Sequence, residues 1–181
     1  MKNIFFTLLI LLSLTACNND DNNNGSTNPV DQLPPATQTG ENSFGCLLDG
    51  EAFIPRGGTN PLDCVYQLVD GGYYFGLQGN KRNSNNDLVG ISVGTNSLQL
   101  FENQTYQLLE NTTNNAQGIY SFYSSSINNY YTSQTHTGEL TITKLDIENQ
   151  IVSGTFWFDV QDNDGVVHQI REGRFDMQYT Q

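Results

Sequence analysis

Positive charge is what this sequence has least of. Its 181 residues include 7 Lys and Arg against 19 Asp and Glu, which gives a net charge of −12 at pH 7. There is no block of basic residues that could follow a phosphate backbone, so nucleic-acid binding is disfavoured. The same charge opposes adsorption to anionic lipid, so attachment to a membrane would have to rest on acyl chains.

Histidine is also scarce, and the usual catalytic motifs are missing. His136 and His168 do not have the spacing of a zinc site. His168 shares a strand face with Val166 and Ile170, so we expect it at the edge of the core. The sequence has no Gly-x-Ser-x-Gly motif, no phosphate-cradling glycine loop and no supported thiol–histidine pair. We therefore predict no catalytic residue, no metal site and no cofactor.

Long apolar runs are limited to one, near the N-terminus. Ile4–Leu14 is too short to cross a hydrocarbon core as a helix, which needs about 20 residues, and with Lys2 before it the run fits a secretory signal. The following Leu14-Thr15-Ala16-Cys17 resembles a bacterial lipobox. The resemblance implies that residues 1–16 are a removed signal peptide and that Cys17 carries the acyl chains of an outer-membrane lipoprotein. The alternative is an ordinary signal with an incidental cysteine.

The segment after Cys17 has almost no apolar side chains. Residues 18–29 contain none that could form a core, and Pro34-Pro35 stiffens the end of the segment. We predict that residues 17–42 form a lipidated, disordered spacer between the membrane and the folded domain. Asp20-Asp21 is similar to the surface-export signal of Bacteroidota-type lipoproteins, although such residues are also common in linkers. The domain would then face the periplasm or the cell surface.

Residues 43–181 lack any amphipathic helical stretch and instead repeat short β-branched and aromatic runs. Asp49-Gly50 and Asp70-Gly71-Gly72 predict hairpin turns, and Gly154 predicts a bulge. The candidate strands are Phe44–Leu48, Ala52–Ile54, Cys64–Val69, Tyr73–Gly79, Leu88–Gly94, Leu98–Phe101, Tyr106–Leu109, Ile119–Ser124, Tyr130–Thr135, Glu139–Leu145, Ile151–Val160, Val166–Ile170 and Arg174–Tyr179.

The fold class follows from these strands and their short connections. In the last strand, alternation places Phe175, Met177 and Tyr179 inward, and Arg174, Asp176 and Gln178 outward. Connections this short join antiparallel strands, since parallel crossovers need a dozen residues or more. We predict a single all-β domain with no substantial helix. Ten or more strands in an antiparallel meander would close as a β-barrel or stack as a β-sandwich.

The beginning and the end of the domain resemble those of a family of uncharacterised Bacteroidota lipoproteins. The opening stretch is Gly40–Gly50 with Phe53-Ile54-Pro55, and the closing stretches are Lys144-Leu145-Asp146, Gly154-Thr155-Phe156 and Arg171–Asp176. The resemblance implies the anchor and a β-rich domain. It transfers no activity and no site residue.

Cysteine is limited to Cys17, Cys46 and Cys64. Compartments outside the inner membrane are oxidising, and Cys46 and Cys64 form an even pair, so we predict a disulfide between them. In the chain-entropy model such a bond would stabilise the domain by about 3 kcal/mol. The alternative is two separate buried thiols.

Acidic residues gather before Gly165, where Asp159, Asp162 and Asp164 suggest calcium. In the EF-hand register set by Gly165, however, Val160 and Arg171 occupy the first and last ligand positions. We interpret Asn163-Asp164-Gly165 as a hairpin turn.

Aromatic side chains give the candidate ligand-binding residues. Trp157 lies on the strand face of Thr155 and Asp159, opposite Phe156 and Phe158. Exposed rings beside Asn and Gln suit stacking on sugars or docking to a protein, although they also close the ends of barrels. The candidates are Trp157, Tyr73, Tyr74, Tyr130 and Tyr131.

Three functions remain open. The first is a non-enzymatic binding or structural module for an envelope glycan or protein. The second is a polysaccharide or peptide hydrolase with a carboxylate pair, although no pair stands out among the many carboxylates. The third is a lipocalin-like carrier of a small apolar ligand. The missing nucleophile motif favours the first.

Overall fold

The protein is an all-β sandwich built from one sheet folded onto itself. The computed structural model describes residues 28–181, which form eleven strands in one sheet and a single 3-10 turn, η1 (Pro29–Gln32). The strands are β1 (Ser43–Leu48), β2 (Glu51–Phe53), β3 (Leu62–Val69), β4 (Gly72–Arg82), β5 (Leu88–Asn96), β6 (Gln104–Leu108), β7 (Asn115–Tyr123), β8 (Ile127–Tyr131), β9 (Gly138–Asp146), β10 (Ile151–Gln161) and β11 (Val167–Gln178). The predicted all-β class is therefore confirmed.

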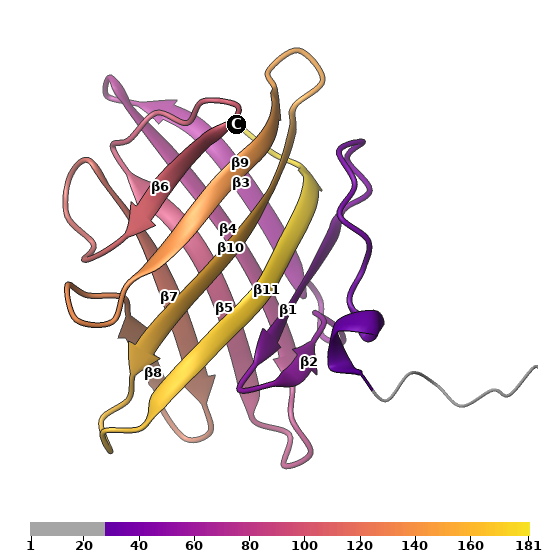
Figure 1. Ribbon diagram of the computed structural model, residues 1–181, viewed down its shortest axis with the longest axis vertical. Coiled ribbons are helices and arrows are strands. Elements are labelled where there is room, and N and C mark those ends of the chain that lie inside the picture. Colours follow the sequence, from indigo (N-terminus) through magenta and orange to yellow (C-terminus); the bar gives the residue numbers. More distant parts are fainter. Residues whose placement is uncertain (1–27) are drawn as a thin grey trace, which may run out of the picture.

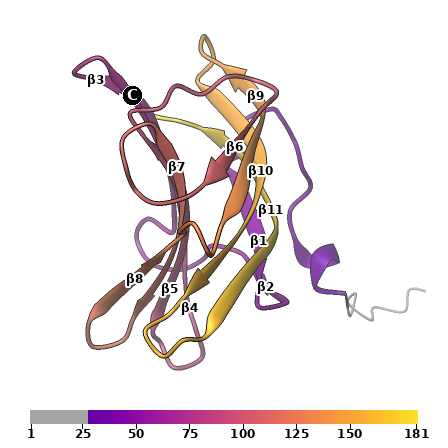
Figure 2. The ribbon, with the colours of Figure 1, turned by 60° about the vertical axis from the view of Figure 1, so that its left-hand side comes forward.

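The sheet order is β2-β1-β11-β10-β9-β6-β7-β5-β4-β3, with β8 beside β7. One layer contains β2, β1, β11, β10, β9 and β6, and the other contains β3, β4, β5, β7 and β8 (Figures 1 and 2). The sheet is not closed, because β2 and β3 remain edge strands. Of the two architectures predicted, the sandwich therefore describes the fold and the closed barrel does not.

The predicted hairpins form, and their turns lie at the predicted residues. Asp49 and Gly50 have positive φ angles of 52° and 85°, and Asp70 and Gly71 have 50° and 81°, as tight two-residue hairpins require. The β9–β10 register shifts between Ser153 and Gly154, which confirms the predicted bulge. The two strands predicted at the C-terminus are instead one, β11, which has a register shift opposite Phe156–Phe158.

The prediction of a simple antiparallel meander is wrong at β6. This strand pairs antiparallel with β9 and parallel with β7, the latter only through Leu108 and Ala116. The chain leaves β5, crosses to the other layer as β6 and returns as β7, which lies beside β5. The expected strand at Leu98–Phe101 is also absent, and this irregular segment makes the crossing.

Aromatic rings fill the space between the layers. Phe44, Phe75, Phe156, Phe158 and Phe175 are all buried, and they form a chain of ring contacts with centroid separations of 5.4–6.4 Å. These rings occupy the space that a lipocalin-like carrier would use for its ligand, so the carrier function finds no support in the core. Phe175, Met177 and Tyr179 point inward as predicted and are buried.

Residues 28–42 differ from the disordered spacer expected up to Asn42. We call them the N-terminal strap, because they run along the outside of β1 and β11 (Figure 1). The side chain of Asn28 caps η1 by accepting the Val30 N–H at 3.2 Å, and Leu33 is buried. Pro34 lies against Gly45, where a Cβ would come within 2.6 Å of its Cδ.

Asp176 anchors the strap to the sheet. Alternation had placed this residue outward and exposed, but it is fully buried because the strap covers it. Its carboxylate accepts hydrogen bonds from the Thr37 hydroxyl, the N–H groups of residues 39, 40 and 41, and the Ser153 hydroxyl, at 2.7–3.2 Å. Burial alone would raise the pKa of this carboxyl, but the hydrogen bonds outweigh it and lower the pKa to about 2.

Candidate functional site

The predicted aromatic residues lie at four separate places. Tyr73 lines a pocket at the end of the sandwich that carries the β3–β4 and β9–β10 turns. Tyr130 and Tyr131 lie on β8, where Tyr130 stacks on Tyr120 with ring centroids 5.9 Å apart. Trp157 lies on the outer face of β10, and Tyr74 is half-buried on β4. These rings therefore do not form one continuous surface.

Trp157 is held in place by residues on both neighbouring strands. Its cross-strand partner on β9 is Glu139, whose carboxylate accepts the indole N–H at 3.3 Å. From β11, the Arg171 guanidinium lies 5.4 Å from the indole centroid and binds the Asp159 carboxylate at 2.7 Å. The predicted orientation is confirmed, because Phe156 and Phe158 are buried while Trp157 is only half-buried.

A groove of about 550 Å³ runs beside this tryptophan, and we call it the Trp157 groove. It reaches from β9, β10 and β11 to Ala36 of the strap. Its lining combines the indole ring with the hydroxyl groups of Thr141 and Thr155, the carboxylates of Glu139 and Glu172 and the guanidinium groups of Arg171 and Arg174. Phe156 and Gly173 complete the lining. Its charged groups are largely engaged already, since Arg174 binds Glu172 at 3.2 Å and Gln107 donates to Glu139 at 3.0 Å.

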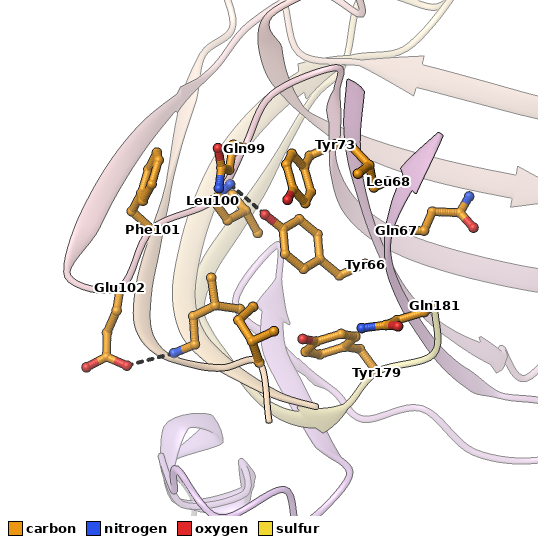
Figure 3. A pocket seen from close by; sticks show the side chains of 12 residues that line it. Tyr66, Gln67, Leu68, Tyr73, Gln99, Leu100, Phe101, Glu102, Tyr179 and Gln181 are labelled. Carbon is orange, nitrogen blue, oxygen red and sulfur yellow. Dashed lines mark hydrogen bonds between the residues drawn. The ribbon is translucent and has the colours of Figure 1, made fainter. Parts of the chain in front are cut away.

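A second cavity, the mouth pocket, has a volume of about 590 Å³ and is lined mainly by aromatic and apolar side chains. Tyr66, Tyr73 and Tyr179 form one side, and Leu100 and Phe101 come from the irregular segment before β6 (Figure 3). Gln67, Gln99, Gln181 and Glu102 supply polar groups, while Leu68, Leu145 and Ile147 complete the lining. A cavity of this size and character falls within the range of small-molecule and peptide sites.

Tyrosine hydroxyls shape the mouth pocket. Tyr66 accepts the Leu100 N–H at 3.0 Å, and Tyr106 accepts the Phe101 N–H at 2.7 Å (Figure 3 shows the first). Burial raises the pKa of Tyr66, Tyr106 and Tyr179, so these phenols are neutral near pH 7. The buried Tyr179 hydroxyl lacks a well-aligned hydrogen bond, and the side chain of Gln181 is its polar neighbour.

His168 joins two hairpin turns at the opposite end of the sandwich. Its Nδ1 lies 2.8 Å from Asp49 of the β1–β2 turn, and its Nε2 lies 3.5 Å from Asp162 of the β10–β11 turn. The ring packs on Tyr120 with centroids 4.5 Å apart, as expected of a residue at the core edge. Sequence reasoning missed both carboxylate partners, because their approach depends on how distant turns meet.

The acidic turn before Gly165 has local hydrogen bonds of its own. Asp162 accepts the N–H groups of Asp164 and Val166 at 2.9 and 2.8 Å, which is the pattern of an Asx turn. Asp159 pairs instead with Arg171. Within residues 28–181, no group of three or more His, Cys, Asp and Glu could hold a metal ion.

Cys46 and Cys64 are both buried and both free, so the predicted disulfide is not formed in the structure. Cys46 pairs with Phe53 across β1–β2, whereas Cys64 pairs with Leu77 across β3–β4. Burial raises the pKa of both thiols. Cys17 lies outside the described residues.

We expect both thiols to be unreactive in the folded protein. Iodoacetamide requires a solvent-accessible thiolate, and burial disfavours both the charge and the access. Mass spectrometry should find Cys46 and Cys64 unmodified under native conditions and both alkylated in 6 M guanidinium without reductant. A linked Cys46–Cys64 peptide in the non-reduced digest would contradict this expectation.

Within residues 28–181, no helix has the length and apolar character needed to cross a membrane. A family model, a domain of unknown function (DUF6252), matches residues 69–177, from the end of β3 almost to the end of β11. The match covers more than half of the chain, although the strap and the β1–β2 hairpin precede it. Searches of curated proteins and of solved structures found no significant match. The chain thus belongs to the DUF6252 family, whose function is not defined.

Proposed function

We propose that this protein is a non-enzymatic binding module of the bacterial cell envelope, anchored to the outer membrane through lipid on Cys17, and that it binds a glycan in the Trp157 groove. The lipobox-like Leu14–Cys17 supports the anchor and the location. The observation that carries the binding function is the immobilised indole of Trp157, positioned by Glu139 and Arg171 beside the groove.

The chemistry of the groove suits sugar rings. An aromatic face offers an apolar platform for the C–H groups of a pyranose, and fixed polar groups around it receive the hydroxyls. Thr141 and Thr155 supply hydroxyls, and Thr141 already exchanges a hydrogen bond of 2.8 Å with Thr105. Because neighbours already hold the indole in place, little side-chain entropy would be lost on binding.

The hydrolase alternative lacks a supporting observation. Glu139 and Glu172 both line the groove, but Glu139 holds Trp157 and Gln107, and Glu172 holds Arg174. In these contacts, the carboxylates of Glu139 and Glu172 orient other side chains. A general acid would instead need a free path to the substrate.

Trp157→Ala should weaken glycan binding at least tenfold, since stacking on a tryptophan typically supplies a large part of such an affinity. The full-length protein in detergent micelles would be screened on an array of envelope polysaccharides, and the best ligand would be titrated by calorimetry. Trp157→Phe should retain part of the affinity. Tyr131→Ala, which removes an exposed ring on β8, is the matched control and should bind normally.

Two outcomes would contradict the proposal. One is equal binding by the Trp157→Ala variant and the parent protein at unchanged melting temperature. The other is that the protein releases reducing sugar from a labelled polymer and that the Glu139→Gln substitution abolishes this release. That result would show that the protein is a hydrolase.

A further inference from the structure

The mouth pocket carries an exposed apolar rim that the glycan site does not use. Leu68, Phe101 and Ile147 are 58%, 53% and 56% exposed, although each has a large apolar side chain. They come from β3, the segment before β6 and the β9–β10 turn, and all three line the same cavity. Exposed apolar side chains gathered around a cavity are typical of a docking surface.

The rim adjoins a partly unpaired sheet edge. β3 is the last strand in the sheet order, and among the described residues its only ladder partner is β4. On the outer side, Thr180 bonds to the Cys64 carbonyl and the Tyr66 N–H at 3.0 and 2.9 Å, in a parallel bridge at Val65. Antiparallel pairing alternates direction, so the N–H and C=O of Leu68 and the C=O of Tyr66 point to this same outer side.

Within residues 28–181, no hydrogen bond is made to these outward groups of Leu68. Unpaired strand edges accept further strands, and an extended peptide that adds to an edge gains both main-chain bonds and side-chain pockets. The bridge with Thr180 shows that this edge already accepts an extended segment. A strand pairing at Leu68 would pass directly along the mouth pocket, which Tyr66, Gln67 and Leu68 line.

The net charge of the protein indicates what kind of polypeptide segment would bind at this edge. Among the described residues that line the pocket, Glu102 carries the one side-chain charge, and its carboxylate lies 3.8 Å from Lys144 and accepts the Leu145 N–H at 2.9 Å. The charge preference thus comes from the whole chain, which carries a net charge of −12. Long-range attraction therefore favours a basic partner over an acidic one. The buried Tyr179 hydroxyl, which lacks a well-aligned partner, offers a polar contact inside the pocket.

We propose that the mouth pocket and the edge of β3 bind an extended basic polypeptide segment by strand addition. The segment pairs with the main chain of Leu68 and inserts one apolar or aromatic side chain between Leu68, Phe101 and Ile147. This site lies apart from the Trp157 groove and gives the protein a polypeptide partner in addition to a glycan.

The test uses a synthetic probe of the predicted chemistry. Fluorescein-labelled Lys-Val-Lys-Phe-Lys-Val-Lys, acetylated and amidated, would be titrated into the full-length protein in micelles and followed by anisotropy. Hydrogen exchange should show that the probe slows exchange of the Leu68 amide. The same peptide N-methylated at alternate residues cannot pair with a strand edge, and it should bind about tenfold more weakly.

Two variants separate the edge from the pocket. Leu68→Pro removes an N–H that faces away from β4, so the β3–β4 ladder stays intact while peptide affinity falls about tenfold. Phe101→Ala, in an exposed loop position, should also weaken the peptide severalfold. Ile127→Ala on β8, 68% exposed, is the control and should bind normally.

The proposal fails if the peptide does not bind at 1 mM, or if Leu68→Pro and Phe101→Ala both bind it with unchanged affinity. It also fails if a neutral saccharide competes with the peptide for the pocket and no longer binds to the Phe101→Ala variant. The pocket would then be a sugar-binding site. Glycan binding that depends on Trp157 is measured separately, so either site can fail alone.

Discussion

Asp176→Ala is expected to lower the free energy of unfolding by about 3 kcal/mol, the largest effect of any single substitution considered for this chain. The carboxylate is fully buried and accepts five hydrogen bonds, four of them from residues 37–41 of the strap. Removing it leaves the Gly40 N–H and the Ser153 hydroxyl without their partner. The strap must then detach to let water reach them. Urea unfolding followed by circular dichroism measures the loss.

Three comparisons separate the effect on the strap from a general loss of stability. Asp164→Ala removes an exposed carboxylate in the β10–β11 turn and should change stability by less than about 0.5 kcal/mol. Asp176→Asn keeps one acceptor oxygen and should fall between the two. Limited proteolysis should cut Asp176→Ala within residues 33–41 before the sheet unfolds. Equal protease resistance in the parent and the variant would show that the strap is not held by this carboxylate.

The same carboxylate predicts a specific dependence on pH. Its pKa in the folded protein is about 2, against 3.8 for an unperturbed Asp. The stabilisation is therefore fully present above about pH 4 and is lost as the pH falls toward 2, by about 2 kcal/mol in total. The Asp176→Ala variant should lack this component. Parallel pH profiles for the two proteins would contradict the assignment.

Local sequence patterns predicted the parts of the fold that depend on neighbouring residues. Asp49-Gly50 and Asp70-Gly71 marked hairpins because a tight turn needs positive φ at those positions. Alternation correctly oriented Phe175, Met177 and Trp157. Such signals operate over a few residues, so a single sequence reveals them.

Contacts between distant segments escaped prediction for the opposite reason. Alternation gave Asp176 its outward direction, but its burial depends on Thr37, 139 positions earlier in the sequence. The strap was assigned to a disordered spacer because its composition is polar. The carboxylate satisfies its polar donors, so apolar burial is not the only force that fixes it.

The candidate sites show the same division. The face of Trp157 could be derived from its strand, whereas Glu139 and Arg171 became its partners only through the β9–β10–β11 register. Leu98–Phe101 has the composition of a strand but remains irregular. Two tyrosine hydroxyls bind its N–H groups, and this places Phe101 on the rim of the mouth pocket.

Gly118→Ala should destabilise the protein by about 2–3 kcal/mol, because it overpacks the contact between the layers. Gly118 lies on β7 and faces Phe158 of β10, and a Cβ there would come within 2.7 Å of two ring atoms of the fully buried Phe158. Both the ring and the strands are enclosed by other core residues, so neither can move away freely.

Gly76→Ala is the matched control, since Gly76 is also a strand glycine but would place its Cβ where no atom lies within 4 Å. It should leave stability unchanged or raise it by about 0.5 kcal/mol, because alanine restricts the unfolded chain. The double variant Gly118→Ala, Phe158→Leu should be less destabilised than the sum of its single changes, since the smaller side chain leaves room for the new methyl group. Similar midpoints of urea unfolding for Gly118→Ala and Gly76→Ala would mean that the contact between the layers does not require a glycine at position 118.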